Sequence, residues 1–86
     1  MEIVVHPRIH ERHEDISAQD VIEAMNNIVA SALRDNGHWC SIGFDLHARP
    51  LEMIYKIVGD VVIVYHALTP PTKKFKKEVG FIPKRG

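Results

Sequence analysis

The chain has 86 residues with 11 acidic and 11 basic side chains, so its formal net charge is zero, and 45% of its residues are hydrophobic against 26% charged. This composition is ordinary for one folded domain and excludes a disordered chain, and a single cysteine excludes an internal disulfide and a cysteine-based zinc site. No apolar run reaches the roughly 18 residues that a membrane helix needs, so we expect a cytoplasmic domain over residues 1–79 with no signal peptide and no membrane contact.

The N-terminal residues are predicted to form a short strand followed by a short helix. Residues 2–5 read as an edge strand, and Pro7 ends it because proline cannot donate a hydrogen bond to a neighbouring strand. Pro7 also suits the first turn of a helix that continues to His13.

A longer central helix is expected next. Ser17 and Asp20 form a start that resembles a capping box, and Asn36-Gly37 supplies a stop. Between these signals, apolar residues recur at helical spacing, at Val21, Ile22, Met25, Ile28, Val29, Ala32 and Leu33. We therefore predict one helix across this whole segment.

The second half of the chain is predicted to form strands. Residues 39–46 alternate apolar and polar side chains, which indicates a half-buried strand. Two apolar runs, 51–58 and 61–67, flank Gly59-Asp60, where glycine supplies the positive φ of a two-residue hairpin turn.

This turn predicts the register of the hairpin. It pairs Val58 with Val61, Tyr55 with Val64, Met53 with His66 and Glu52 with Ala67. Because side chains alternate along a strand, His66 is expected on the core face and Glu52 on the opposite face. The two side chains can then meet only at the sheet edge or through a bulge.

The C-terminal segment is predicted to form a short basic helix. Thr69-Pro70-Pro71 ends strand pairing, and Phe75 and Val79 are spaced to share the inward face of a helix over residues 72–79. Four side chains then point outward, Lys73, Lys74, Lys76 and Lys77. Residues 80–86 are expected to be a flexible tail.

One pattern of order and spacing extends over residues 6–78. Its matching residues are Arg12-His13, Ile16-Ser17, Ile42-Gly43, Arg49-Pro50-Leu51-Glu52, Val61–Ala67 and Thr72–Lys77. This pattern resembles the BrnT-like toxins of bacterial type II toxin–antitoxin systems, which belong to the RelE-like ribonuclease superfamily, and the chain would be a divergent member. It has His66-Ala67-Leu68 where the better-known members have Ser-Ala-Arg.

The resemblance implies a fold, an activity and a partner. The fold would be α+β, with an N-terminal short strand and helices packed on a three- to four-stranded antiparallel sheet and a short basic C-terminal helix. The activity would be metal-independent cleavage of single-stranded or ribosome-associated RNA, without a cofactor. The partner would be a small cognate antitoxin, and a homodimer is left open.

Four residues are candidates for catalysis of this reaction. Cleavage needs a base for the ribose 2′-hydroxyl, an acid for the leaving 5′-oxygen, and cations near the phosphate. Glu52 or His66 would be the base and His13 or His66 the acid. Arg49 would clamp the phosphate together with lysines of the C-terminal helix.

The expected RNA-binding residues are mostly basic. Lysines follow a phosphate backbone by charge, and an aromatic ring can stack on a base. The candidates are Lys73, Lys74, Lys76, Lys77, Arg12 and Tyr65, with Phe75 as a second stacking residue. The same lysines are equally suited to bind an acidic antitoxin segment, or to be an ordinary solvated face.

Two other interpretations stay open at the level of sequence. The spacing of His6, His10 and His13 would let them meet at a metal ion on one helix face, although a solvated polar face explains them as well and we expect no metal. The chain would alternatively be a catalytically inactive module of the same fold that binds an antitoxin-like protein. A small-molecule or metal-binding protein is the third interpretation.

Overall fold

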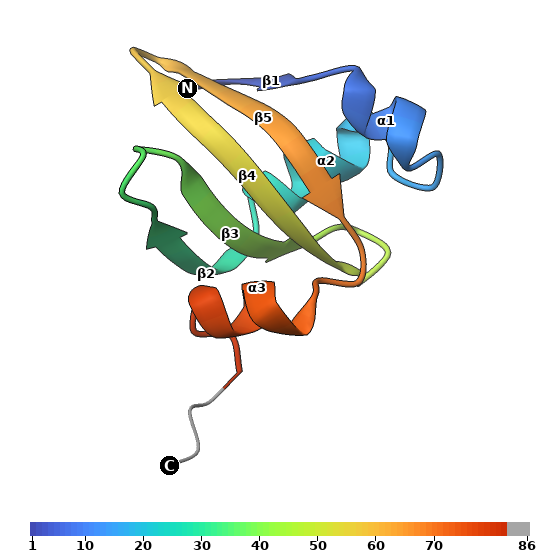
Figure 1. The fold of residues 1–86 in the computed structure, drawn as a ribbon. Helices are drawn as coiled ribbons and strands as arrows, with labels where there is room; N and C mark the ends of the chain where they lie inside the picture. The colour runs from blue at the N-terminus through green and yellow to red at the C-terminus, as the bar shows by residue number, and fades with distance from the viewer. Residues whose placement is uncertain (83–86) are drawn as a thin grey trace.

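The computed structural model describes residues 1–82 and has a five-stranded sheet with three short helices (Figure 1). The elements in chain order are β1 (Glu2–Val5), α1 (Arg8–Arg12), α2 (Ala18–Met25), β2 (Ile28–Leu33), β3 (Trp39–Phe44), β4 (Pro50–Val58), β5 (Val61–Leu68) and α3 (Lys73–Glu78). The strand order is β1-β5-β4-β3-β2. Within the described residues, no helix is long and apolar enough to cross a membrane.

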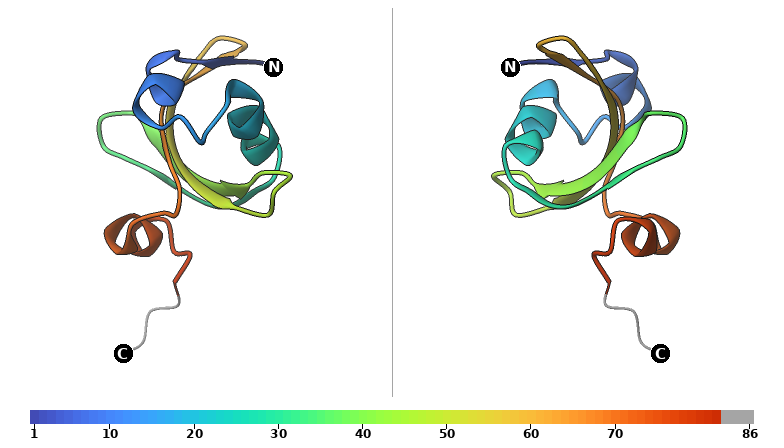
Figure 2. Two further views of the ribbon diagram at one scale, coloured as in Figure 1. Left: turned by 90° about the vertical axis from the view of Figure 1, so that its right-hand side faces the viewer. Right: turned by 90° about the vertical axis from the view of Figure 1, so that its left-hand side faces the viewer.

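The sheet curves around α2 (Figure 2). Its two faces carry separate hydrophobic cores. The first core lies between the sheet and the helices α1 and α2, and it contains Ile9, Ile16, Val21, Ala24, Leu51, Met53, Tyr55, Val62, Val64 and Ala67. The second core lies under α3 and contains Cys40, Ile42, Phe75 and Val79. The α+β class is therefore confirmed.

The sheet has more strands than the sequence predicted, and it is not purely antiparallel. The predicted central helix is wrong beyond Met25, because Ile28–Leu33 forms β2 and pairs antiparallel with β3. β1 pairs parallel with β5, whereas the other neighbours pair antiparallel. The result is a mixed sheet of five strands in place of three or four antiparallel ones.

α2 begins at the predicted capping box, and asparagine side chains bond to its last turn. Ser17 Oγ accepts a hydrogen bond from the Asp20 N–H, and the Asp20 carboxylate accepts one from the Ser17 N–H. At the other end, the side-chain amides of Asn26 and Asn27 donate to carbonyl oxygens of the last turn. These bonds cap the last turn of α2, and the chain then continues into β2.

β3 is covered on both faces, so the expectation of a half-buried strand is wrong. Cys40 and Ile42 lie under α3, while Ser41 and Gly43 are buried on the side of α2. A side chain at Gly43 would place its Cβ 2.0 Å from the carbonyl oxygen of Ala24. The absence of a side chain there lets α2 approach the sheet closely.

The β4–β5 hairpin has the predicted turn but not the predicted register throughout. Val58 pairs with Val61 and Tyr55 with Val64, as expected. The register then shifts, so that His66 pairs with Ile54 and not with Met53. Tyr65 is the extra residue of this β-bulge, and the insertion moves His66 onto the α3 face of the sheet, where Glu52 lies.

The C-terminal helix agrees with the sequence prediction. Phe75 and Val79 are buried, while Lys73, Lys74 and Lys77 are exposed and Lys76 is half-buried. Phe81 packs against the second core, so the expected tail begins with a residue that belongs to the fold. The expectation of flexibility for the end of the tail, residues 83–86, lies outside the described residues.

Candidate functional site

The bulge in β5 brings a histidine against a buried carboxylate. His66 Nε2 lies 2.9 Å from Glu52 Oε2. Glu52 is only 5% exposed, whereas the side chain of His66 is 34% exposed. This pair therefore has one buried member, which holds the other at the surface.

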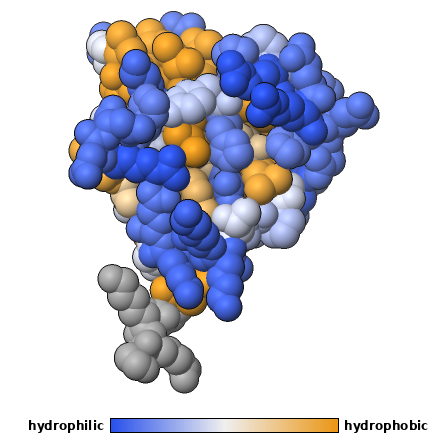
Figure 3. All heavy atoms as spheres, viewed as in Figure 1, coloured by the Kyte–Doolittle hydropathy of each residue, from blue (hydrophilic) through white to orange (hydrophobic). Residues whose placement is uncertain are grey.

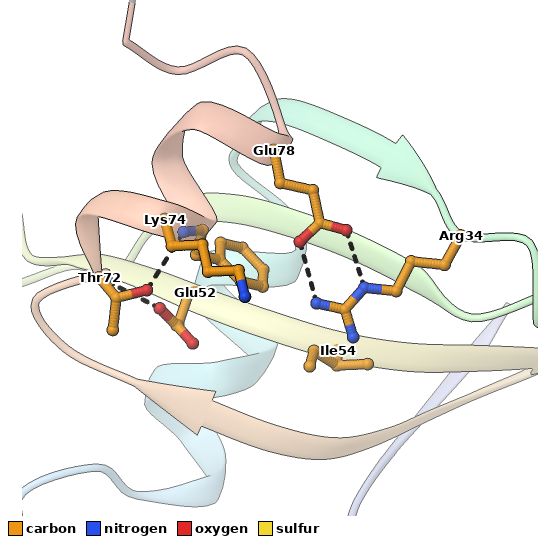
Figure 4. A pocket seen from close by; sticks show the side chains of 7 residues that line it. Arg34, Glu52, Ile54, Thr72, Lys74 and Glu78 are labelled. Carbon is orange, nitrogen blue, oxygen red and sulfur yellow. Dashed lines mark hydrogen bonds and ion pairs between the residues drawn. The ribbon is translucent and has the colours of Figure 1, made fainter.

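The carboxylate of Glu52 is fixed from a second side by α3 (Figure 4). Its Oε1 accepts a hydrogen bond from the backbone N–H of Thr72 at 2.8 Å, and Thr72 is the N-cap residue of the helix. Burial by itself raises the pKa of Glu52, but the hydrogen bonds from His66 and Thr72 outweigh it and hold the pKa below the ordinary range. An ionised carboxylate can only accept hydrogen bonds, so Nε2 of His66 is the donor in its contact with Glu52.

His66 also lines a small hollow between α1 and the end of β5. The lining residues are Arg8, Ile9, Arg12, His13, Tyr65, His66 and Ala67. The hollow encloses only about 10 Å³, close to the space of one water molecule, so a larger ligand would lie across its mouth. Two arginines and two histidines give this mouth the chemistry of an anion-binding surface.

Five of the predicted site residues therefore gather at one place. His66, His13, Arg12 and Tyr65 line the hollow, and Glu52 supports His66 from behind. Tyr65 is half-buried, and its hydroxyl lies 2.6 Å from Nδ1 of His38.

Arg49 is not part of this cluster. Its guanidinium donates to Asp45 Oδ2 at 2.8 Å, to the carbonyl oxygen of Asp15 at 2.9 Å and to Asp20 Oδ2 at 3.0 Å. The hydrogen bond to Asp45 raises the pKa of Arg49. Three aspartates surround this one cation, so it ties the β3–β4 loop to the start of α2, and an approaching phosphate would be repelled.

The lysines of α3 form a separate basic surface. Lys73, Lys74 and Lys77 are exposed, and Lys76 is half-buried. In the view of Figure 3, hydrophilic side chains cover both α1 and α3. Phe75 is 4% exposed, so this ring packs in the core and is not accessible to a base.

Lys74 also stands over a hollow of about 210 Å³ between α3 and the sheet (Figure 4). Ile54 and Phe75 contribute apolar lining, and at the far side Arg34 forms a two-bond ion pair with Glu78, at 2.8 and 2.9 Å. Glu52 belongs to the lining of this hollow as well.

The N-terminal histidines do not gather at one point. His6 Nδ1 accepts a hydrogen bond from the Arg8 N–H, and His10 Nδ1–H donates to the carbonyl oxygen of Ile16. Across residues 1–82 there is no group of three or more His, Cys, Asp or Glu side chains placed to hold a metal ion. His13 alone of the three lines the hollow beside His66.

Sequence reasoning missed Arg8 and the pair Arg34–Glu78. A signal for Arg8 was present, because Arg8 and Arg12 are four residues apart on a predicted helix and so share a face. Arg34 and Glu78 are 44 residues apart, and no local pattern could have joined them.

Comparison with known proteins adds no relative to this description. No family model matches the chain, and neither a curated protein nor a solved structure matches it.

Proposed function

We propose that this protein is a metal-independent endoribonuclease whose reacting group is His66. The observation that carries the proposal is the bulge at Tyr65, which sets His66 against the buried carboxylate of Glu52. A carboxylate that holds one imidazole nitrogen orients the ring and favours proton uptake at the other nitrogen.

The proposed reaction uses the two histidines of the hollow. His66 Nδ1 takes the proton of the ribose 2′-hydroxyl, the 2′-oxygen bonds to phosphorus, and the bond to the 5′-oxygen breaks. His13 gives a proton to the departing 5′-oxygen, so the products are a 2′,3′-cyclic phosphate and a 5′-hydroxyl. Arg8 and Arg12 stabilise the negative charge on the phosphorane. In this scheme Glu52 is a positioning residue, because both of its oxygens accept hydrogen bonds within the protein.

The biological role that we propose is that of a toxin in a toxin–antitoxin pair. It is supported by the resemblance to BrnT-like toxins and by the α+β architecture, in which a basic helix follows the last strand. The outer lysines of α3 offer a docking surface for an acidic segment of a small antitoxin.

A second candidate function is a catalytically inactive module that binds such a protein partner. The observation that favours it is the engagement of Arg49 by three aspartates, which removes one expected phosphate clamp. The RNA-cleavage experiment separates the two candidates.

We predict that the purified protein cleaves a long single-stranded RNA in the presence of EDTA, and that His66→Ala lowers the rate by at least about 100-fold, as expected for loss of an acid–base group. The matched control is His47→Ala, which removes an exposed histidine that does not line the hollow. Gel analysis of a labelled RNA measures the rate. Equal cleavage by wild type and His66→Ala would contradict the catalytic assignment, and no cleavage by wild type would favour the binding module.

A further inference from the structure

We propose that two copies of this chain pair through their β2 strands, so that two five-stranded sheets join into one continuous sheet. The β2 strand of the second copy pairs antiparallel with β2 of the first, and the two-fold axis passes through Ser31. This inference is independent of the proposed ribonuclease activity.

The edge of β2 is uncharged and contains no proline, and a register irregularity at Val29 is confined to its start. β2 is the last strand of the sheet, and its sequence from Ile28 to Leu33, IVASAL, contains no charged residue and no proline. Val29 and Leu33 are each 57% exposed and Ile28 is 37% exposed. Natural sheets protect an open edge with charges, prolines or a covering segment, so an uncharged six-residue edge with exposed apolar side chains is suited to pairing.

The opposite edge of the sheet is different. β1 has four residues, carries Glu2 at its start and is followed by Pro7. Beyond Val64, where β1 ends, β5 lies against α1. The β1 edge is short and charged, and beyond it α1 lies beside β5, so this edge is poorly suited to pair with another strand. The β2 edge is better suited to pairing.

The backbone of β2 selects one register. The Arg34 N–H donates to the carbonyl oxygen of His38 in the β2–β3 connection. Because backbone groups alternate along a strand, those of Leu33 and Ser31 point away from β3 and toward the open edge. Val29 is the extra residue at a register irregularity and has no partner residue in β3.

Pairing Ser31 with Ser31 of a second copy uses these outward groups best. It also sets Val29 opposite Leu33, and Ala30 opposite Ala32, so the side chains that face each other from Val29 to Leu33 are small or apolar. The smallest shift that keeps outward backbone groups opposite each other is two residues, and it sets Leu33 opposite Asn27 or Val29 opposite Asp35, both outside the strand. The self-pairing is therefore complementary in backbone groups and in side chains.

Charge does not oppose the pairing of two copies. The formal net charge of the chain is zero. In this register Arg34 faces Ile28 and Asp35 faces Asn27, so no like charges are opposite each other. Because a single strand pair is a small interface, we expect a dimer that forms with rising concentration.

Sedimentation equilibrium over a wide concentration range tests this pairing. Wild type should rise from the mass of one chain toward twice that mass. Ser31→Lys should remain monomeric, because it sets two like charges opposite each other at the axis. The control Val58→Lys, at an exposed apolar position of β4, should dimerise as wild type does. A wild type that stays monomeric at every concentration, or a Ser31→Lys variant that dimerises equally well, would overturn the proposal.

A cross-link tests the register without depending on the lysine variant. The variant is Ser31→Cys combined with Cys40→Ala, so that the new cysteine is the single thiol. Directly opposite residues in this register have Cα atoms about 5.5 Å apart, within the range of a disulfide, so mild oxidation should give a covalent dimer. The control is Val4→Cys in the same background, on the β1 edge. A cross-link that forms with Val4→Cys but not with Ser31→Cys would refute the β2 pairing.

Discussion

Glu52 links the candidate site to the stability of the fold, because its side chain is buried and both of its oxygens accept hydrogen bonds. Burial alone would raise the pKa of this carboxyl, and the bonds from His66 and Thr72 lower it below its ordinary value of 4.5. A carboxyl with a lowered pKa stabilises the fold above its unfolded-state pKa. That stabilisation is lost as the pH falls through the folded-state pKa.

We predict that Glu52→Gln lowers the free energy of unfolding at pH 7 by about 1–3 kcal/mol, because a neutral amide accepts weaker hydrogen bonds than a carboxylate. The difference from wild type should shrink as the pH falls below 4.5, where the wild-type carboxyl takes up a proton. Urea unfolding at a series of pH values measures this difference. Glu11→Gln, at an exposed helix position, is the control, and a constant difference at every pH would contradict an ionised Glu52.

The outcomes for His66, Glu52 and Arg49 show what sequence reasoning can predict about single residues. His66 and Glu52 could be chosen as candidates because their residue types suit the chemistry, and a bulge was the condition for their meeting. The bulge itself could not be predicted, since the hairpin turn fixes register only until a tertiary contact shifts it. Arg49 has the right chemistry for phosphate, but Asp45 of its own loop and Asp15 and Asp20 from the start of α2 bind its guanidinium.

Among the secondary-structure elements, α2 and β3 depend on one close approach. Gly43 has no Cβ, and a Cβ there would lie 2.0 Å from the carbonyl oxygen of Ala24 and 3.1 Å from that of Asn27. These are backbone atoms at the end of α2, so they cannot move aside without displacing the helix.

We therefore predict that Gly43→Ala destabilises the protein by about 3 kcal/mol, in the range of overpacking in a tight core. Chemical denaturation monitored by far-UV circular dichroism measures the change. Val58→Ala, at an exposed position of β4, is the comparison and should stay within about 0.5 kcal/mol of wild type. An unchanged midpoint for Gly43→Ala would mean that α2 does not pack against β3 this closely.

The β2 segment shows why element assignment from sequence was incomplete. Apolar residues at Met25, Ile28, Val29, Ala32 and Leu33 fit a helical period, so the helix that begins at Ser17 was predicted to be too long. Residues 28–33 fit a strand equally well, and pairing with β3 decides between the two. Local signals at the ends of elements, at Ser17 and Gly59, were reliable because their chemistry is local.

Acidic and basic side chains are unevenly distributed along the chain, and the charged surfaces differ from the uncharged β2 edge. Residues 1–40 hold seven acidic and three basic side chains, and residues 41–86 hold four acidic and eight basic ones. The α3 lysines and the α1 arginines flank the Glu52–His66 pair, while the β2 edge is uncharged. One side of the protein is thus suited to an anion and one sheet edge to a second copy.

We propose that His66, held by Glu52, promotes attack of the RNA 2′-hydroxyl on the neighbouring phosphate. The most direct measurement compares one RNA with a DNA of the same sequence in EDTA and identifies the ends of the products. We expect the RNA to be cut to give a 2′,3′-cyclic phosphate and a 5′-hydroxyl, and the DNA to stay intact. Cleavage of the DNA as well as the RNA, cleavage that EDTA abolishes, or no cleavage of the RNA would contradict this mechanism.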